Sequence, residues 1–363
     1  MQLGPLISDL TISKLLIQVL IVISMDPYKI LKIAPNPDGT ITRLATLPLV
    51  PPTESPTPNL NGNKGDGPIV LSKDVPLNPS KNTFVRIFRP ATAAPAKKLP
   101  LIIYFHGGGF VFYSAASIMF HESCNAVSAS LPAVIVSVDY RLAPEHRLPA
   151  AYEDAVEAIA WVKDQAMQTD AGEPWLRDYA DFKNCFLMGS SSGGNIAYNA
   201  GLPALDMELL PLKIQGLIIN QPYFGGVEWS ESELRLSDDK MISLVSNELM
   251  WSLALPEGAN RDHEYANPMV NGQFDEKIGR LPRCFLNGYG GDPLVDRQRE
   301  LGRLLESRGV EVVKVFHEDG YHAVELFEPA KFQALVKNVG DFVRSCVDAK
   351  EQLAGMENNP QKL

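Results

Sequence analysis

A serine flanked by glycines stands between a short apolar segment and a run of small residues. The segment reads Gly189-Ser190-Ser191-Ser192-Gly193, and only Ser191 has glycine two positions before it and two positions after it. This spacing is typical of a nucleophile on a sharp turn between a strand and a helix, where larger flanking side chains would collide with backbone. The same spacing also occurs in ordinary strand–helix turns. Ser191 alone therefore does not define a site.

Three consecutive glycines follow an apolar segment upstream of this turn. The sequence His106-Gly107-Gly108-Gly109-Phe110 comes directly after PLIIYF. Glycine runs lose much conformational entropy on folding, so they usually serve close backbone approach or unusual dihedral angles. We expect the amides of Gly107, Gly108 and Ser192 to form an oxyanion hole, and we expect His106 to hold the glycine loop. A phosphate-binding loop is the alternative, but no trailing Gly-Lys-Ser/Thr is present.

A serine nucleophile needs a base that takes its proton and an acid that orients the base. In this type of site the chain order is Ser, then Asp or Glu, then His. Downstream of Ser191 the histidines are His263, His317 and His322. His322 lies in a loop after the last predicted strand, at the sheet edge where the serine also emerges. We predict that His322 is the base.

The acid is expected in the loop that follows the strand 283–288. Asp292 lies nearest the strand end and precedes Pro293, so we predict that it orients His322. Asp296 falls where the next helix should start, which favours an N-cap role for it. Asp319 is too close in sequence to His322 to reach round the ring.

These residues require a framework of strands and helices that alternate along the chain. Apolar or β-branched runs predict strands at 69–75, 83–89, 100–105, 133–139, 185–189, 212–220, 283–288 and 310–316, and helices are expected at 150–166, 193–201, 296–308 and 328–347. Such alternation predicts an α/β fold with a mostly parallel sheet covered by helices on both faces. The first two strands have no helix between them, which indicates an antiparallel edge.

Two segments fall outside this alternation. Residues 222–275 contain two tryptophans among acidic residues and no clear strand, and we predict that they form a helical cap. Residues 48–68 are rich in Pro, Asn, Gly and Thr, a composition typical of a loop. The predicted organisation is an N-terminal cap segment with linker at 25–68, a core at 69–221 and 276–350, the cap insertion at 222–275 and a tail at 351–363.

Composition limits the possible functions. The chain has 363 residues, 45% of them hydrophobic and 21% charged, and its formal net charge is −10. Nucleic-acid binding needs clustered Lys and Arg, and no such cluster is evident. The four cysteines have no metal-binding spacing and are expected to be reduced, buried thiols. We predict no metal, no cofactor and no nucleic-acid partner, and we expect a monomer.

The first 24 residues allow two interpretations. The apolar run 15–23 is shorter than the roughly 20 residues that span a bilayer. It could be the core of a signal peptide, although the preceding residues carry Asp9 and no basic residue before Lys14. The alternative is an upstream extension before a second start at Met25. We predict a cytoplasmic protein, with the secretory pathway as the alternative.

Taken together, the motifs resemble the hormone-sensitive-lipase-like branch of the α/β hydrolases, and most closely the plant carboxylesterases. HGGGF, VDYRLAPEHRLPAAYEDA, GSSSGGN, GDPLVD and GYHAV stand in the expected order, within about 69–347. The resemblance implies an α/β-hydrolase fold, a Ser-His-Asp triad, no metal, and short- to medium-chain esters of small alcohols or phenols as substrates. One departure is visible, because the branch usually has an acidic residue just before the nucleophile and often alanine after it, where this chain has Ser190 and Ser192.

The substrate pocket is expected between the cap and the triad. Apolar and aromatic candidates are present on both sides, and they favour an uncharged acyl group: Phe110, Tyr223, Phe224, Leu249, Met250 and Val324. Two other functions stay open. One is a receptor related to the plant gibberellin receptors, which lack the triad histidine that this chain retains. The other is a dehydratase or cyclase that uses the same site.

Overall fold

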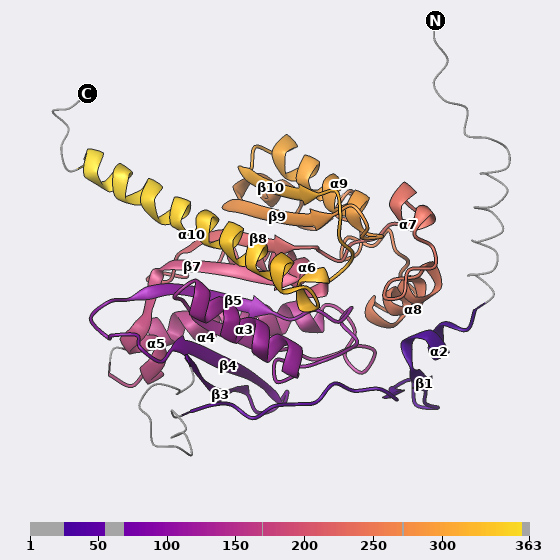
Figure 1. The fold of residues 1–363 in the computed structure, drawn as a ribbon, viewed down its shortest axis with the longest axis horizontal. Helices are drawn as coiled ribbons and strands as arrows, with labels where there is room; N and C mark the ends of the chain where they lie inside the picture. Colours follow the sequence, from indigo (N-terminus) through magenta and orange to yellow (C-terminus); the bar gives the residue numbers. More distant parts are fainter. Residues whose placement is uncertain (1–24, 55–68, 169, 271, 358–363) are drawn as a thin grey trace, which may run out of the picture.

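The computed structural model describes residues 25–54, 69–168, 170–270 and 272–357. Its centre is an eight-stranded sheet (Figure 1), with the strands in the spatial order β10 (Val312–His317), β9 (Arg283–Tyr289), β8 (Ile214–Asn220), β7 (Ala180–Ser190), β5 (Leu99–Phe105), β6 (Val134–Asp139), β4 (Thr83–Pro90) and β3 (Val70–Asn78). The strands from β10 to β6 run parallel, whereas β4 is antiparallel to β6 and β3 is antiparallel to β4. The mostly parallel sheet and its antiparallel edge confirm the prediction.

Strand β5 shows why these sequences form buried strands. Leu101, Ile103 and Phe105 pack into the core on one face, while Ile102 and Tyr104 pack into the core on the other. Successive side chains of a strand point to opposite faces, so a strand that is covered on both faces reads as a continuous apolar run. The segment PLIIYF therefore belongs in the middle of the sheet.

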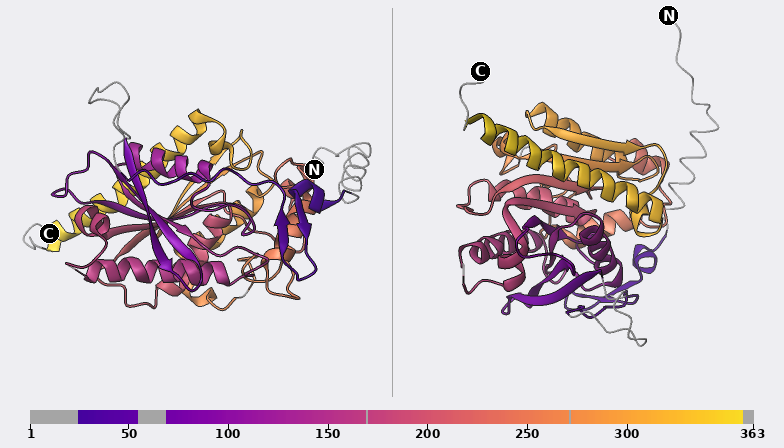
Figure 2. Two further views of the ribbon diagram at one scale, coloured as in Figure 1. Left: turned by 90° about the horizontal axis from the view of Figure 1, so that it is seen from below. Right: turned by 60° about the vertical axis from the view of Figure 1, so that its left-hand side comes forward.

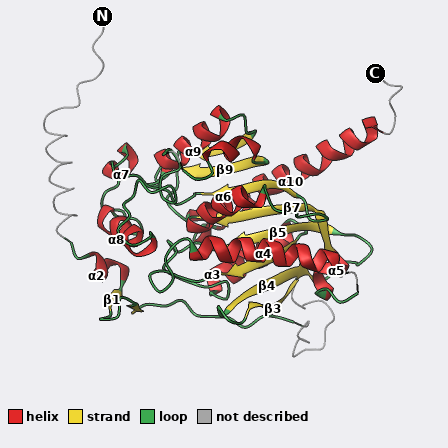
Figure 3. Cartoon of the chain, turned by 180° about the vertical axis from the view of Figure 1, so that it is seen from behind, coloured by secondary structure: helices red, strands yellow, loops and turns green. Residues whose placement is uncertain are grey.

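Helices form a layer on each face of the sheet. On the face seen in Figure 1 lie α3 (Ile118–Ser130) and α10 (Pro329–Glu357). Figure 3 shows the opposite face, covered by α4 (Ala150–Met167), α6 (Ser192–Ala204) and α9 (Val295–Ser307). A short helix, α5 (Pro174–Tyr179), precedes β7. This is the three-layer arrangement that the alternation of strands and helices predicts.

Two segments far apart in the sequence meet beyond the carboxyl ends of the parallel strands. One holds α2 (Pro27–Leu31) and the hairpin of β1 (Ile33–Pro35) and β2 (Ile41–Arg43), and the other holds α7 (Glu231–Arg235) and α8 (Leu244–Ala254). Helix α2 packs against α8, and the views in Figure 2 show the N-terminal segment at this end of the sheet. We call these two segments together the cap.

Three helices of these layers differ from the predicted elements. The short helix α5 was not predicted, because its 6 residues are too few to show a helical periodicity. Helix α3 was not predicted, because serine and asparagine interrupt its apolar face, of which Phe120, Cys124 and Val127 are buried. Helix α10 extends to Glu357, beyond the predicted end at 347, because residues 348–354 contain neither glycine nor proline. Two 3₁₀ turns, Asp275–Arg280 and Val324–Leu326, complete the elements.

Within the described ranges, no helix has the length and apolar character needed to cross a bilayer. The apolar run 15–23 and its two interpretations lie outside the described residues.

Candidate active site

The turn between β7 and α6 places Ser191 at the carboxyl edge of the sheet. Ser191 has φ 57° and ψ −122°, a conformation that side chains rarely adopt. A Cβ on Gly189 would overlap the carbonyl of Gly193, and a Cβ on Gly193 would overlap the carbonyl of Phe105. Both flanking glycines are therefore required by close backbone approach. Such strained residues cost about 1–3 kcal/mol and occur at functional sites.

Three predicted residues from separate loops meet at this turn. The Nε2 atom of His322 lies 2.9 Å from Ser191 Oγ, and its Nδ1 atom lies 2.8 Å from Asp292 Oδ2. With the proton on Nδ1, the ring donates to Asp292 and accepts from the serine hydroxyl. This is the arrangement of a serine nucleophile, its base and the acid that orients the base.

Hydrogen-bond donors fix the carboxylate of Asp292, the acid of this site. Asp292 is fully buried, and it accepts hydrogen bonds from the Leu294 amide (2.9 Å) and from Nε2 of Gln298 (2.8 Å). Burial by itself lowers the pKa of His322, but the charge of Asp292 and the hydrogen bond to it outweigh burial. The net effect raises the pKa of His322 above its ordinary value. The site is therefore organised to stabilise the imidazolium form.

A side chain that the sequence analysis did not single out fixes the loop of His322. Gln221 follows β8, and its Nε2 donates to the carbonyl of Tyr321 (3.0 Å) while its Oε1 accepts from the amide of Ala323 (2.7 Å). One amide group thus binds the backbone on both sides of His322. The only sequence signal was the polar pair Asn220-Gln221 at the end of an apolar strand.

The glycine loop lies against the nucleophile. A Cβ on Gly107 would lie 3.3 Å from Ser191 Cβ, and Gly108 has φ +122°, a value that favours glycine. In the described parts of the chain, no hydrogen bond joins the N–H groups of Gly107, Gly108 or Ser192 to another residue. Ser192 also opens α6, whose N-terminal end carries partial positive charge. These three amides are thus free to bind a developing oxyanion.

His106 holds this loop, as predicted. Its Nδ1 lies 2.8 Å from the carbonyl of Gly107, and its ring stacks on Tyr140 with centroids 4.2 Å apart. The Tyr140 hydroxyl donates to the carbonyl of His106 (2.8 Å). Burial lowers the pKa of His106 to about 4, so the ring is neutral near pH 7 and donates from Nδ1.

The alternative triad candidates have other contacts. His263 lies beside Tyr265 in the segment after α8, with ring centroids 4.4 Å apart, and His317 stacks on Tyr289 at 4.8 Å. Asp319 is exposed and pairs with Lys331.

The predicted N-cap role of Asp296 is wrong. The residue that caps α9 is Leu294, and Asp296 lies inside the first turn. Its carboxylate accepts from the amide of Ser232 in α7 (2.8 Å), so it joins the cap to the core instead. The sequence could not show this, because the partner comes from a segment 64 residues away.

The six predicted pocket residues are all buried. Phe110, Tyr223 and Trp251 form an aromatic cluster in which the rings of Tyr223 and Trp251 stack at 4.5 Å, and the Sδ of Met250 would lie 2.7 Å from a Cβ on Gly109. The other three are also buried: Phe224, Leu249 and Val324. The ring of Phe224 packs edge-on against Tyr198 of α6. The assignment of these residues to substrate binding stays a prediction.

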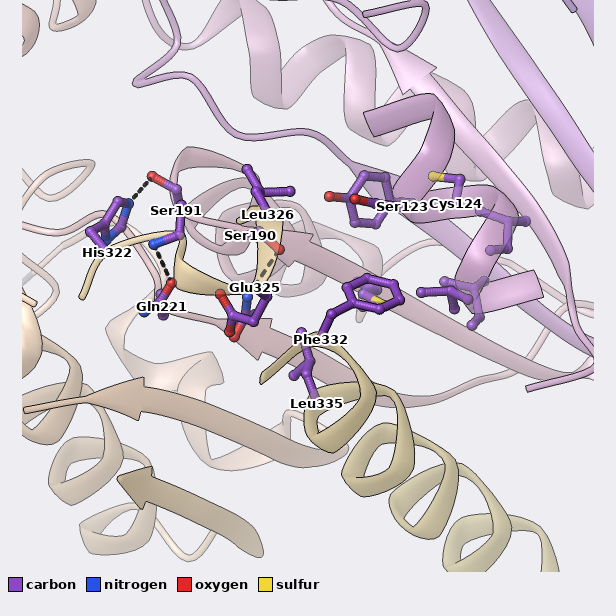
Figure 4. Close-up of a pocket in the computed structure, with 17 residues that line it drawn as sticks. Ser123, Cys124, Ser190, Ser191, Gln221, His322, Glu325, Leu326, Phe332 and Leu335 are labelled. Atoms are coloured by element: carbon purple, nitrogen blue, oxygen red, sulfur yellow. Dashed lines mark hydrogen bonds between the residues drawn. The ribbon is translucent and has the colours of Figure 1, made fainter. Parts of the chain in front are cut away.

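A small cavity of about 40 Å³ lies behind the nucleophile. Figure 4 shows the Ser191 hydroxyl directed at His322, on the side away from Cys124 of α3 and Phe332 of α10. Ser190 and Glu325 also line this cavity. None of the six predicted pocket residues is among its lining residues.

Comparison with known proteins identifies the class of this site. A family model described as the alpha/beta hydrolase fold matches residues 102–326, more than half of the chain. Solved esterases from Rhizomucor miehei (TM-score 0.66, 22% identity, 78% of this chain and 85% of that one) and Pyrobaculum calidifontis (TM-score 0.63, 22% identity, 96% of each chain) share the fold. The protein is an α/β hydrolase.

Curated relatives narrow the class further. The chain is 53% identical to "Probable carboxylesterase 8" of Arabidopsis thaliana, over 89% of this chain and 95% of that protein. It is 43% identical to "3-O-acetylpapaveroxine carboxylesterase CXE1" of Papaver somniferum, over 88% and 97%. The chain therefore belongs to the plant carboxylesterases, which are carboxylic ester hydrolases, as the sequence motifs predicted.

Proposed function

We propose that the protein hydrolyses short- to medium-chain carboxylic esters of small molecules through an acyl-enzyme intermediate. The observation that carries this proposal is the continuous hydrogen-bonded series from Asp292 through His322 to Ser191. The free amides of the glycine loop beside Ser191 support it. The names of the poppy relatives specify an O-acetyl ester, which supports a short acyl group.

In the first half of the proposed reaction, the Ser191 oxygen attacks the ester carbonyl while its proton moves to Nε2 of His322. The carbonyl oxygen becomes an oxyanion, which accepts hydrogen bonds from the amides of Gly107, Gly108 and Ser192. The carbon–oxygen bond to the alcohol then breaks, and His322 gives its proton to the leaving alcohol. An ester between the acyl group and Ser191 remains.

In the second half, a water molecule loses a proton to His322 and attacks the acyl carbon. Collapse of the second oxyanion breaks the bond to Ser191, and His322 returns the proton to the serine oxygen. The carboxylic acid leaves. Asp292 stays ionised throughout and keeps the proton of His322 on Nδ1.

Hydrolysis of p-nitrophenyl butyrate tests this proposal. Wild-type protein should release p-nitrophenol with an initial burst when deacylation is slow, and Ser191→Ala should reduce kcat by about 10⁶-fold. Ser307→Ala, at the exposed end of α9, is the control and should retain full activity. An inert wild type would overturn the proposal, and elimination products without hydrolysis would favour a lyase.

Measurement of kcat/KM against acyl chains from acetate to dodecanoate tests the acyl preference. We expect a maximum at or below medium length, because a buried apolar site contributes about 0.8 kcal/mol for each CH₂ only while space remains. A rate that still rises at dodecanoate would contradict the proposed preference.

We also propose that the protein is cytoplasmic and monomeric. Fractionation of its native tissue and N-terminal sequencing test the location. A start after a cleaved segment would support the secretory pathway instead. Light scattering of the purified protein should give the mass of one chain, and a doubled mass would contradict a monomer.

A further inference from the structure

Glu325 is a buried carboxyl group that the proposed reaction does not use. It lies three residues after His322 and is only 6% exposed. It shares the small cavity behind the nucleophile with Ser190. Figure 4 shows the two side chains close together on the side of Ser191 that faces away from His322. A buried carboxyl group is costly unless it has partners, so its contacts need an explanation.

A row of polar side chains joins Glu325 to the nucleophile turn. Ser190, Asn220 and Asn287 lie opposite one another on β7, β8 and β9. Asn220 Nδ2 donates to Ser190 Oγ (3.2 Å), and Asn287 Nδ2 donates to Asn220 Oδ1 (2.8 Å) and to Glu325 Oε1 (3.2 Å). We call these four residues the strand-end row. It connects the loop of His322 to the loop of Ser191 across three strands.

Titratable and charged groups from several elements surround Glu325. His322, on the same loop, and Asp292 both act on Glu325 through their charges. The phenols of Tyr289 on β9 and Tyr104 on β5 also face it. Helix α10 places Lys331 over the Tyr289 ring at 5.5 Å, and α3 contributes the neutral thiol of Cys124. His322 lines the same cavity as Glu325, and its imidazolium is the cation that forms there during the proposed reaction.

Burial is the largest influence and raises the pKa of Glu325 above its ordinary value, although hydrogen bonds and the charge of His322 act in the opposite direction. In turn, the negative charges of Asp292, Asp239 and Glu325 all raise the pKa of His322, in decreasing order of effect. The two groups are thus coupled. Each stabilises the charged form of the other.

We propose that Glu325 is a positioning residue that acts through His322: the strand-end row fixes the loop that carries both residues, and the buried carboxylate adds negative charge in the cavity that both residues line, in addition to the charges of Asp292 and Asp239. This inference rests on the proposed function, because it assigns His322 as the base. It predicts that the charge at position 325, and not only its shape, controls the imidazole.

The test compares two isosteric variants by their pH profiles. Glu325→Gln keeps the bond from Asn287 but removes the charge, so the acid limb of kcat/KM should move to lower pH and the plateau should fall about tenfold. Glu328→Gln removes an exposed charge from the same loop and should leave both unchanged, because solvent screens it. A folded Glu325→Gln variant whose acid limb stays at the wild-type pH would overturn the proposal.

A second variant tests whether a carboxylate at position 190, at the other end of the strand-end row, can replace the charge of Glu325. Ser190→Asp combined with Glu325→Gln places a carboxylate in the same cavity, whose volume exceeds that needed for a water molecule. We expect the acid limb to return toward its wild-type position. If Glu325→Gln does not fold, Glu325→Asp serves in its place and should keep the wild-type acid limb while lowering the rate.

Nuclear magnetic resonance separates this proposal from the proposed function. The titration of the His322 ring, observed in the free protein, should occur at lower pH in Glu325→Gln than in wild type. This measurement does not depend on ester hydrolysis. An inert wild type would therefore refute the esterase proposal, whereas an unchanged His322 titration would refute the role of Glu325.

Discussion

The catalytic edge of the sheet and the cap above it are held by different kinds of contact. At the edge, Asn287 donates to Asn220 at the end of the neighbouring strand, and the Gln221 side chain bonds to the backbone on both sides of His322. The cap is held by aromatic packing and by a few long-range polar contacts, of which Arg43 on β2 is the clearest. The difference suggests that changes at the edge reduce the rate of the chemical step, whereas changes in the cap alter substrate binding and stability.

Among the residues that support Ser191 at the edge and in the cap, the largest effect is expected at the acid of the triad. Asp292→Asn should lower kcat by about 10⁴-fold, because the neutral amide no longer fixes the proton on Nδ1 of His322. The charge of Asp292 raises the pKa of His322, so the acid limb of the remaining activity should shift to lower pH. A pH profile measures both effects. Asp319→Asn is the exposed control, and equal losses in the two variants would contradict the assignment.

The next largest effect is expected at Gln221, whose side chain fixes the loop of His322. Gln221→Ala removes both bonds that flank His322, and a misplaced base costs about 10²-fold in kcat with little change in KM. Steady-state kinetics measure the two constants separately. Gln215→Ala removes a bond to the carbonyl of Lys183 far from the triad and should have wild-type activity. A change in KM alone for Gln221→Ala would show that Gln221 acts in substrate binding and not in positioning His322.

A smaller effect is expected where the cap meets the core. Arg43 donates to the carbonyls of Val111 (2.6 Å) and Ala143 (2.8 Å) and pairs with Glu145 (2.8 Å). Arg43→Ala should raise KM several-fold with little change in kcat, and should lower the free energy of unfolding by about 1–3 kcal/mol. Kinetics and urea denaturation test this. A drop in kcat equal to that of Gln221→Ala would contradict the inference that contacts of the cap affect substrate binding and stability and not the rate of the chemical step.

The contact between Arg43 and Glu145 makes the stability of the protein depend on pH. Burial by itself raises the pKa of Glu145, but the hydrogen bond from Arg43 and other bonds outweigh it, so the net pKa is lowered. A group with a lowered folded pKa stabilises the protein above its unfolded pKa, and this contribution disappears as pH falls through the folded value. Arg43→Ala should therefore destabilise the protein less at pH 3 than at pH 7. Equal destabilisation at the two pH values would contradict the ion pair.

The smallest effect is expected inside the aromatic cluster of the cap. The buried Tyr223 hydroxyl donates to Asn247 Oδ1 (2.7 Å), and Tyr223→Phe removes this bond while keeping the stacked ring. We expect a loss of about 1 kcal/mol in the free energy of unfolding and nearly unchanged kcat. Thermal denaturation measures the loss of stability, and steady-state kinetics measure kcat. A tenfold fall in kcat would show that this hydroxyl reaches the substrate.

The sequence by itself determined the local chemistry of this protein. Glycines at 189 and 193 indicated the strained turn at Ser191, because only glycine tolerates such close backbone approach. The apolar run before His106 predicted a central strand for the same local reason. The choice of Asp292 and His322 followed from the chain order Ser, Asp, His of this type of site. A parallel sheet, whose strand ends share one edge, brings the three loops together. The fold and the family were predictable from these features.

The tertiary structure alone decided how those residues are supported. Gln221, Asn287 and Glu325 look like ordinary polar residues in the sequence, and their partners lie 38 to 102 residues away. Asp296 was misassigned for the same reason, since its partner Ser232 belongs to the cap. Local patterns carry information about turns and strands, because those depend on adjacent residues. Hydrogen bonds between strand ends depend on register and packing, which only the folded chain defines.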